Sequence, residues 1–365
     1  VLWFPKKIQT WQSISQLYPK NGMRTVVHKT VDQLQPPSQE DRSLAAKGWG
    51  SSASHEHWMG SWACLNEVEV KHPQNSSDLP EKLVVGAWNL ERCKWVEESA
   101  EVIRTAKIDV LLATEVDWGM ARSKQRHTTQ ELAERLGWGS AVGVEFVELG
   151  LGDPLETAEF NGVPNEHGLH GNAILSRWPL QAIKLIALDE GGLWYVQSPK
   201  QDGQHRVGGR MAIAALLETE KGPLGCVAVH YESESNPDHR NQQTQRLMEL
   251  LVQEYGTVPM VIGGDLNTNT LSEAHTSQTQ RRIQPESWEP SFSTFANYNF
   301  AWKTTNTGQT TTRRGPHHST HAPHRTLDWL LLRSCQGSQS RVVPALSKAE
   351  NYLSDHEMVV TTVSC

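Results

Sequence analysis

The sequence predicts a layered α/β fold for the part of the chain that begins near residue 82. LVVGAW (83–88) and IDVLLATE (108–115) are apolar enough to be buried strands. KWVEESAEVIRTA (94–106), between them, has the spacing of an amphipathic helix. Several short apolar runs follow further along the chain. Strands and helices that alternate in this way are typical of sheets covered by helices.

The remaining elements follow in chain order. Further apolar strands are predicted at residues 141–147, 172–176, 211–218, 224–231, 259–264, 327–332 and 358–363. A helix is predicted over residues 239–255, with leucines and a methionine near its middle. Residues 304–324 have the composition of a loop, and the sequence contains no internal repeat.

Residues 1–81 differ in character from the rest of the chain. They are rich in Ser, Gln, Pro and Trp and lack sustained periodicity, so they do not provide a core of their own. GWGSSASHEHWMGSW (48–62) is predicted to be irregular structure held by aromatic side chains, and residues 72–82 have the composition of a linker. We expect a Trp-rich N-terminal extension, residues 1–81, that packs on a larger domain, residues 82–365.

Composition excludes several classes of protein. No apolar run approaches the roughly 20 residues that a membrane-spanning helix needs. The formal net charge of −7 gives no general basic field for sequence-independent binding to nucleic acid. Five cysteines without a CxxC pair argue against a zinc site or a dense disulfide framework, and they leave one or two disulfides open. We expect a soluble monomer. The start at Val1 rather than Met suits a secreted protein or a processed fragment, and the compartment stays open.

Polar side chains gather where the predicted strands begin or end. They are Asn89, Glu91, Glu115, Asp117, His230, Asp265, Asn267, Asp328, Asp355 and His356. Taken singly, a carboxylate at a strand end is more often a turn former or a helix cap than a functional group. Oxygen donors, amides and histidines at so many strand ends instead indicate one cleft, formed by loops at the same end of the sheets.

This set of side chains suits metal-assisted hydrolysis of a phosphate ester. Carboxylate ligands without cysteine favour Mg²⁺ or Mn²⁺ over Zn²⁺. The reaction also needs donors to the phosphate oxygens and a group that orients or deprotonates water. Asn89, Asn267 and His230 are candidate donors, and Asp265 or His356 is a candidate base.

Seven motifs occur in a fixed order along the chain: WNLE, ATE, HGNAILSR, VHY, GGDLN, LDWLLL and SDH. Their order resembles that of the endonuclease/exonuclease/phosphatase superfamily, whose fold is similar to that of deoxyribonuclease I. The resemblance implies a four-layered α/β sandwich of two mostly antiparallel β-sheets flanked by helices. It also implies that residues 82–365 are a catalytic domain and that the cofactor is Mg²⁺ or Mn²⁺.

The resemblance implies metal-binding roles for four residues. The principal metal ligand falls on Glu115, and Asp355 lies near the metal. Asn89 lies beside the metal and the phosphate. Glu91 is a further candidate ligand, at a position that varies within the superfamily.

The catalytic roles fall on five residues. Asp265 orients or activates the attacking water, and Asn267 binds the phosphate. His230 contacts the phosphate or the leaving oxygen. Asp328 is expected to hydrogen-bond His356 and so to hold the imidazole in one tautomer.

Two other polar residues, Arg210 and His170, each have two interpretations. Arg210 is a candidate for phosphate binding or for a structural salt bridge, and His170 for phosphate binding or for a turn. A histidine-rich stretch precedes Asp328, but its spacing fits no standard zinc motif and its setting is that of a loop that overhangs the cleft. Its histidines are His317, His318, His321 and His324.

The substrate is less closely defined. The superfamily contains nucleases, sphingomyelinases, inositol polyphosphate phosphatases and deadenylases, which differ mainly in their loops. The acidic charge balance disfavours a nonspecific nuclease, so we expect hydrolysis of a phosphodiester in a small or lipid-derived substrate. A metal-dependent nuclease acting on DNA or RNA is the alternative. A non-catalytic binding module with the same fold is a third reading, and it would be expected to have lost central positions that are all present here.

Overall fold

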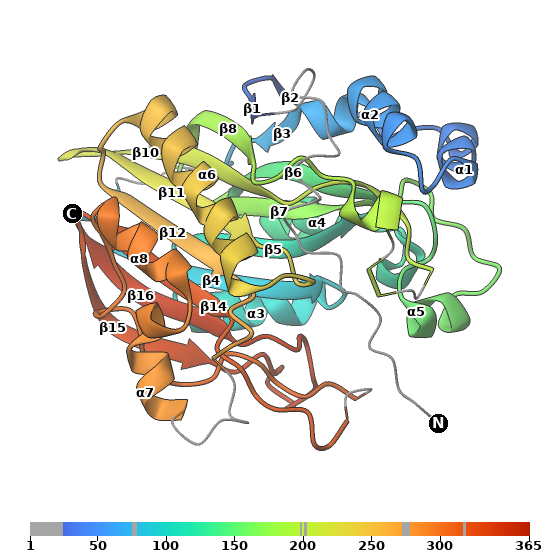
Figure 1. Cartoon of the computed structure of the whole chain (residues 1–365). Helices are drawn as coiled ribbons and strands as arrows, with labels where there is room; N and C mark the ends of the chain where they lie inside the picture. The colour runs from blue at the N-terminus through green and yellow to red at the C-terminus, as the bar shows by residue number, and fades with distance from the viewer. Residues whose placement is uncertain (1–24, 75–78, 198, 201–202, 272–277, 317–318) are drawn as a thin grey trace.

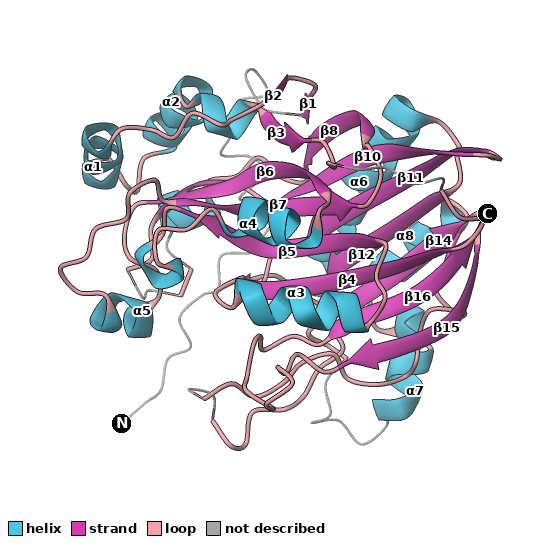
Figure 2. Cartoon of the chain, turned by 180° about the vertical axis from the view of Figure 1, so that it is seen from behind, coloured by secondary structure: helices cyan, strands magenta, loops and turns pink. Residues whose placement is uncertain are grey.

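The computed structural model describes residues 25–74, 79–197, 199–200, 203–271, 278–316 and 319–365. These residues form two β-sheets packed face to face, with helices on both outer faces (Figures 1 and 2). The four-layered sandwich predicted from the sequence is therefore confirmed. None of the helices described is long and apolar enough to cross a membrane.

The seven-stranded sheet has the strand order β1-β8-β10-β11-β12-β14-β13. Its strands are β1 Val26–Val27, β8 Gln181–Ala187, β10 Met211–Thr219, β11 Gly222–His230, β12 Met260–Asp265, β14 Asp328–Arg333 and β13 Phe300–Ala301. Within it, β11 and β12 are parallel, and the other neighbours described are antiparallel.

The nine-stranded sheet runs β15-β16-β4-β5-β7-β6-β3-β2, and β9 pairs with β6. Its strands are β15 Gln336–Val343, β16 Met358–Ser364, β4 Leu83–Arg92, β5 Val110–Trp118, β7 Leu169–Ser176, β6 Gly139–Glu148, β3 Val68–Lys71, β2 Thr30–Val31 and β9 Arg206–Gly208. Here β4–β5 and β2–β3 are the parallel pairs described. A disulfide between Cys335 and Cys365 joins the start of β15 to the end of β16, and Cys64, Cys93 and Cys226 are buried thiols.

Helices cover the two outer faces of the sandwich. The helices α3 (Val96–Thr105) and α4 (Thr128–Leu136) pack on the nine-stranded sheet, and α6 (Pro237–Tyr255) and α8 (Pro290–Asn297) pack on the seven-stranded sheet. The helix α6 begins two residues before its predicted start, because Pro237 occupies its first turn and the Asn236 side chain caps the N–H of His239. The other helices are α1 Gln39–Lys47, α2 Ser52–Ser61, α5 Pro154–Glu159 and α7 Gln278–Ile283.

The side chains of the central strands point alternately to two packed layers, which explains why the sequences of these strands are apolar throughout. In β5, Val110 and Leu112 face the seven-stranded sheet, whereas Leu111 and Ala113 face the helices α3 and α4. Side chains of a strand point alternately to its two faces, so a strand between two packed layers needs apolar residues on both. This arrangement leaves the strand ends as the places where polar side chains are found.

The described part of the N-terminal segment joins both sheets: β1 pairs with β8, and β3 pairs with β6. Trp62 is buried with Leu34 and Leu65 against the edge of the nine-stranded sheet. The boundary at residue 81 stays a prediction, and residues 1–24 lie outside the described part of the chain. The prediction of irregular structure over residues 48–62 was wrong, because the Ser51 side chain caps the helix α2, whose apolar residues are spread around its circumference.

Arg42 of α1 ties the N-terminal segment to the loop between β6 and β7. Its Nη2 donates hydrogen bonds to the carbonyl oxygens of Asn165 at 2.9 Å and Glu166 at 2.8 Å. We expect Arg42→Met to lower the free energy of unfolding by about 1–3 kcal/mol, because it removes charged hydrogen bonds from a buried position. Amide hydrogen exchange within residues 150–168 should rise. Arg104→Met, at an exposed position on α3, is the matched control, and unchanged exchange in the loop would contradict the prediction.

Candidate active site

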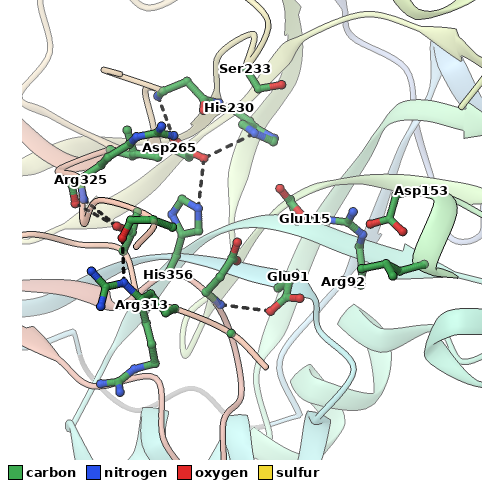
Figure 3. Close-up of a pocket in the computed structure, with 18 of the residues that line it drawn as sticks. Glu91, Arg92, Glu115, Asp153, His230, Ser233, Asp265, Arg313, Arg325 and His356 are labelled. Carbon is green, nitrogen blue, oxygen red and sulfur yellow. Dashed lines mark hydrogen bonds and ion pairs between the residues drawn. The ribbon is translucent and has the colours of Figure 1, made fainter. Parts of the chain in front are cut away.

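The predicted residues meet at one end of the sandwich, where strands of both sheets stop. In the seven-stranded sheet, β11 ends at His230 and β12 at Asp265, and the register places Asp265 opposite both His230 and Asp328. In the nine-stranded sheet, β4 contributes Asn89 and β5 contributes Glu115. The side chains from both sheets converge at a cleft of about 770 Å³ (Figure 3).

Most of the predicted site residues reach this cleft. Asn89 and Asp328 lie behind it and hydrogen-bond residues that line it. The predicted residues that line the cleft are Glu91, Glu115, His170, Arg210, His230, Asp265, Asn267, Asp355 and His356.

Local distortions of the backbone position the acidic residues. The pairing of β4 with β5 is interrupted around Glu91, and the pairing of β5 with β7 is interrupted around Glu115. Glu91, Glu115 and Asn267 have φ values of +44°, +56° and +48°, a region that residues other than glycine rarely occupy. Such conformations cost on the order of 1–3 kcal/mol each and cluster at functional sites.

Asp265 lies at the centre of the site. Its Oδ2 accepts a hydrogen bond from Asn89 Nδ2 at 3.2 Å and lies 3.7 Å from His230 Nε2 and 3.9 Å from His356 Nε2. Its Oδ1 accepts the backbone N–H of Asn267 at 2.8 Å. One carboxylate oxygen is therefore held toward two imidazoles.

His356 and Asp328 form the hydrogen-bonded pair that the sequence predicts. His356 Nδ1 donates to Asp328 Oδ2 at 2.8 Å, and Thr311 Oγ1 donates to the same oxygen at 2.7 Å. Burial raises the pKa of Asp328 to about 6. Burial also opposes protonation of His356, but Asp328 and the other nearby carboxylates outweigh it and hold the imidazole pKa well above its usual value. The pair therefore favours an imidazole whose Nε2 carries a proton toward Asp265.

The carboxylates of Glu91, Glu115 and Asp355 form an acidic cluster beside Asp265. Glu91 Oε2 accepts hydrogen bonds from the backbone N–H of Asp355 at 3.1 Å and from the hydroxyl of Tyr352 at 2.5 Å. Glu115 Oε1 accepts one from Asn89 at 3.0 Å. Burial, together with the charges of Glu91 and Glu115, raises the pKa of Asp355 to about 7.

This acidic cluster fits a hard divalent cation. Its donors are oxygens, and their mutual repulsion is what a bound cation would offset. Among the described residues, Asp265, Asp328 and His356 are the group whose ligand atoms all lie within 4.8 Å of one another, whereas the three carboxylates of the acidic cluster are more widely spaced. Each of the two groups contains an oxygen that already accepts two hydrogen bonds, which is Asp328 Oδ2 in this group and Glu91 Oε2 in the acidic cluster.

A half-buried arginine that the sequence analysis did not single out contacts the acidic cluster. Arg92 forms an ion pair with Glu115, and its Nε lies 3.4 Å from Glu156 Oε1 of α5. Burial alone would raise the pKa of Glu115, but the Arg92 charge outweighs burial and holds that pKa well below its usual value. Glu115 is therefore ionised and paired with Arg92.

His170 is held by a second ion-pair group behind the cleft. Its Nδ1 donates to Asp117 Oδ1 at 2.7 Å. Arg122 donates to both oxygens of Asp117, at 2.8 and 3.0 Å, and to Glu156 Oε2 at 3.0 Å. His170 lies within the strand β7, so the turn reading was wrong. Its role in phosphate binding stays a prediction.

Arg210 lies behind His230 and is surrounded by carboxylates. Its Nε donates to Glu232 Oε2 at 3.0 Å, its Nη1 donates to Glu145 Oε1 at 3.1 Å, and Nη1 also lies 3.0 Å from His230 Nδ1. This geometry is that of the salt-bridge alternative, and it lets Arg210 fix the orientation of His230. Phosphate binding by Arg210 itself stays a prediction.

Two packed sheets with carboxylates, amides and an oriented histidine at one end are the architecture of deoxyribonuclease I-like proteins. The chain belongs to the endonuclease/exonuclease/phosphatase family, whose sequence profile matches residues 86–356. Members of this family generally hydrolyse phosphate esters. None of the curated proteins matches the sequence.

Solved structures with the same fold include three bacterial proteins of this family. The endonuclease/exonuclease/phosphatase from Beutenbergia cavernae DSM 12333 is 19% identical, with a TM-score of 0.51 over 78% of this chain and 71% of that one. The protein from Bacteroides vulgatus is 14% identical, with a TM-score of 0.50 over 78% and 98%. The family protein from Leptotrichia buccalis C-1013-b is 11% identical, with a TM-score of 0.50 over 78% and 100%. At these identities the likeness concerns the fold alone.

Proposed function

We propose that this chain is a divalent-metal-dependent phosphoesterase that hydrolyses a phosphodiester by in-line attack of an activated water. One observation carries the proposal. Asp265 Oδ2 lies 3.7 Å from His230 Nε2 and 3.9 Å from His356 Nε2, at the edge of a cluster of three carboxylates. A base, two imidazoles and a cation-binding cluster around one point are the groups that phosphoryl transfer to water requires.

Each side chain has a distinct part in this proposal. Asp265 orients the water and accepts its proton. His230 and Asn267 donate hydrogen bonds to the non-bridging oxygens of the phosphate. His356, held by Asp328, presents Nε2–H to the negative charge that develops on the phosphate.

The acidic cluster is the proposed metal site. Glu115 and Asp355 would be the principal ligands, with Asn89 and Glu91 beside them. A Mg²⁺ or Mn²⁺ ion bound there supplies Lewis-acid polarisation of a phosphate oxygen. Arg92 keeps Glu115 ionised, whereas burial raises the pKa of Asp355 to about 7.

A small or lipid-derived phosphodiester is the first candidate substrate, because the net charge of −7 disfavours nonspecific binding to nucleic acid. A metal-dependent nuclease is the second candidate, and one observation favours it. Basic side chains line the cleft locally despite the acidic net charge; they are Lys94, Lys200, Arg206, Arg313, Arg314 and Arg325.

A panel of phosphate esters tests the proposal. The substrates are bis-p-nitrophenyl phosphate, p-nitrophenyl phosphate, plasmid DNA, RNA and sphingomyelin, each with Mg²⁺, Mn²⁺ or EDTA. We expect at least one phosphodiester to be hydrolysed with metal and not with EDTA. Asp265→Asn should lower kcat/KM on the order of 10²-fold or more. The same change at the exposed Asp32 is the matched control, and hydrolysis that is unaffected by EDTA or by Asp265→Asn would refute the proposal.

A further inference from the structure

One wall of the cleft is formed by the loop that precedes β14. Its lining residues are 312–316 and 322–325, and we call them the arginine wall. The backbone N–H of Arg325 donates to Thr312 Oγ1 at 2.7 Å, which holds the two halves of the wall together. The backbone N–H of Arg313 donates to the carbonyl of Asp355 at 2.7 Å. Because Asp355 adjoins His356, the wall is fixed to the segment that carries the catalytic imidazole.

Two cations of the arginine wall lack a carboxylate partner. Arg313 is neutralised by Glu357 at 2.7 Å. Within the described part of the chain, no carboxylate lies within ion-pair distance of Arg314 or Arg325. Among the described residues, the Arg325 guanidinium makes one hydrogen bond, to the neutral amide oxygen Asn269 Oδ1 at 3.4 Å, and its Nε is buried without a hydrogen-bond partner.

An arginine that is partly buried without a counter-charge indicates that an anion completes the site. Desolvating a guanidinium costs free energy unless hydrogen bonds and an opposite charge compensate it. The Arg314 Nε donates to the carbonyl of Ala322 at 2.7 Å, which anchors the side chain and leaves its terminal nitrogens for a ligand. Guanidinium groups match the oxygens of phosphate closely, because they can donate two parallel hydrogen bonds.

Two of the acidic residues and two of the arginines lie on different sides of the centre of the cleft (Figure 3). In Figure 3, Glu91, Glu115 and Arg92 lie on one side of His356 and Asp265, and Arg313 and Arg325 lie on the other. A phosphate held between His230, Asp265 and His356 would therefore have the acidic cluster on one side and the arginine wall on the other. Any group that the substrate extends toward the wall meets unneutralised positive charge.

We infer that Arg314 and Arg325 form a subsite for a second phosphate of the same substrate molecule, next to the phosphate that is hydrolysed. This inference rests on the proposed function and narrows its substrate class to esters that carry at least two phosphates. The second phosphate has two sources with the same chemistry. It is either the adjacent phosphodiester of a nucleic acid strand or the second phosphate group of a small molecule.

The test compares ligands that differ by one anionic group. A series of alkylenediphosphonates of increasing length is measured against alkylphosphonates of the same length, as inhibitors of bis-p-nitrophenyl phosphate hydrolysis and by calorimetry at constant Mg²⁺. We expect the best diphosphonate to bind about tenfold more tightly than its monophosphonate, as a charge-assisted arginine contact provides. The double variant Arg314→Gln/Arg325→Gln should lose this advantage. Chelation of Mg²⁺ by the ligands is the same for every variant and cancels in the comparison.

The control variant is Arg104→Gln, which matches the single change Arg314→Gln by removing one positive charge from an exposed position on α3, and it should keep the advantage. Arg314 is exposed, so Arg314→Gln alone keeps the test valid if the change at Arg325 harms folding. If no diphosphonate binds better than its monophosphonate, or if the advantage survives in the double variant, the subsite is refuted.

Two further comparisons distinguish the two sources of the second phosphate and distinguish the subsite from the proposed function. A preference for tetrathymidylate over dithymidylate that depends on Arg314 and Arg325 would identify a nucleic acid strand. An advantage confined to the diphosphonates would identify a small bisphosphate. Hydrolysis without a diphosphonate advantage would leave the proposed function and refute the subsite. Arginine-dependent diphosphonate binding without any hydrolysis would refute the proposed function and support the subsite.

Discussion

Replacing Glu115 by Gln is expected to remove nearly all metal-dependent hydrolysis, on the order of 10³-fold or more in kcat/KM. Glu115 lies in the acidic cluster with Glu91 and Asp355, and its ionised form is maintained by Arg92. The amide of Gln has the same size but carries no charge, so the cluster loses one of the charges that attract a divalent cation. Calorimetric titration with Mg²⁺ should show weaker binding in the variant than in the native chain.

The fold should survive this substitution. Gln keeps an acceptor for one of the two hydrogen bonds that Asn89 and Arg92 donate to the separate oxygens of Glu115, and Arg92 retains Glu156 as a partner. We therefore expect near-native circular dichroism and a cooperative melting transition. Glu101→Gln, the same change at an exposed position on α3, is the control and should keep full activity. Metal-dependent activity that persists in Glu115→Gln would refute the assignment of this residue.

The layered core could be predicted because the sequence records burial directly. Strands such as β5 are apolar on both faces, and that pattern is produced by packing between two layers. The sequences of the N-terminal helices show no such pattern of burial. Ser52–Ser61 has no continuous apolar stripe, so its helix depends on the Ser51 cap and on contacts with distant strands. Those contacts are properties of the assembled fold and not of the local sequence.

The candidate site was predictable in its central residues and not in the charges behind them. Asp265, His230 and Asp328 stand at strand ends, and the strand register alone brings them together. Arg92 and Glu232 directly follow the motifs WNLE and VHY, so their position was a usable signal. The partners of Arg92 and Glu232 were not predictable. These contacts depend on strand interruptions and positive φ angles that have no signature in the composition.

Replacing Asp328 by Asn should lower turnover on the order of 10²-fold or more, with a smaller change in KM. Asp328 Oδ2 accepts a hydrogen bond from His356 Nδ1 at 2.8 Å and is the largest of several nearby charges that keep the imidazole protonated. The amide of Asn fits the same space, so the strand β14 and the hydrogen bond from Thr311 should persist. With its carbonyl oxygen in the place of Oδ2, Asn still accepts from His356 Nδ1 but carries no charge, so the imidazole loses the proton on Nε2 and presents an acceptor, rather than a donor, on the substrate side.

The double variant decides whether the two residues act as one unit. His356→Ala should be at least as severe as Asp328→Asn, because it removes the donor itself. If Asp328 acts only by orienting and charging that ring, it has nothing left to act on once the ring is gone. Asp328→Asn/His356→Ala should then be scarcely slower than His356→Ala, measured as kcat for the best phosphodiester of the panel. Losses that multiply would instead show that Asp328 acts on the reaction through another group, such as Thr311 or the neighbouring Asp265.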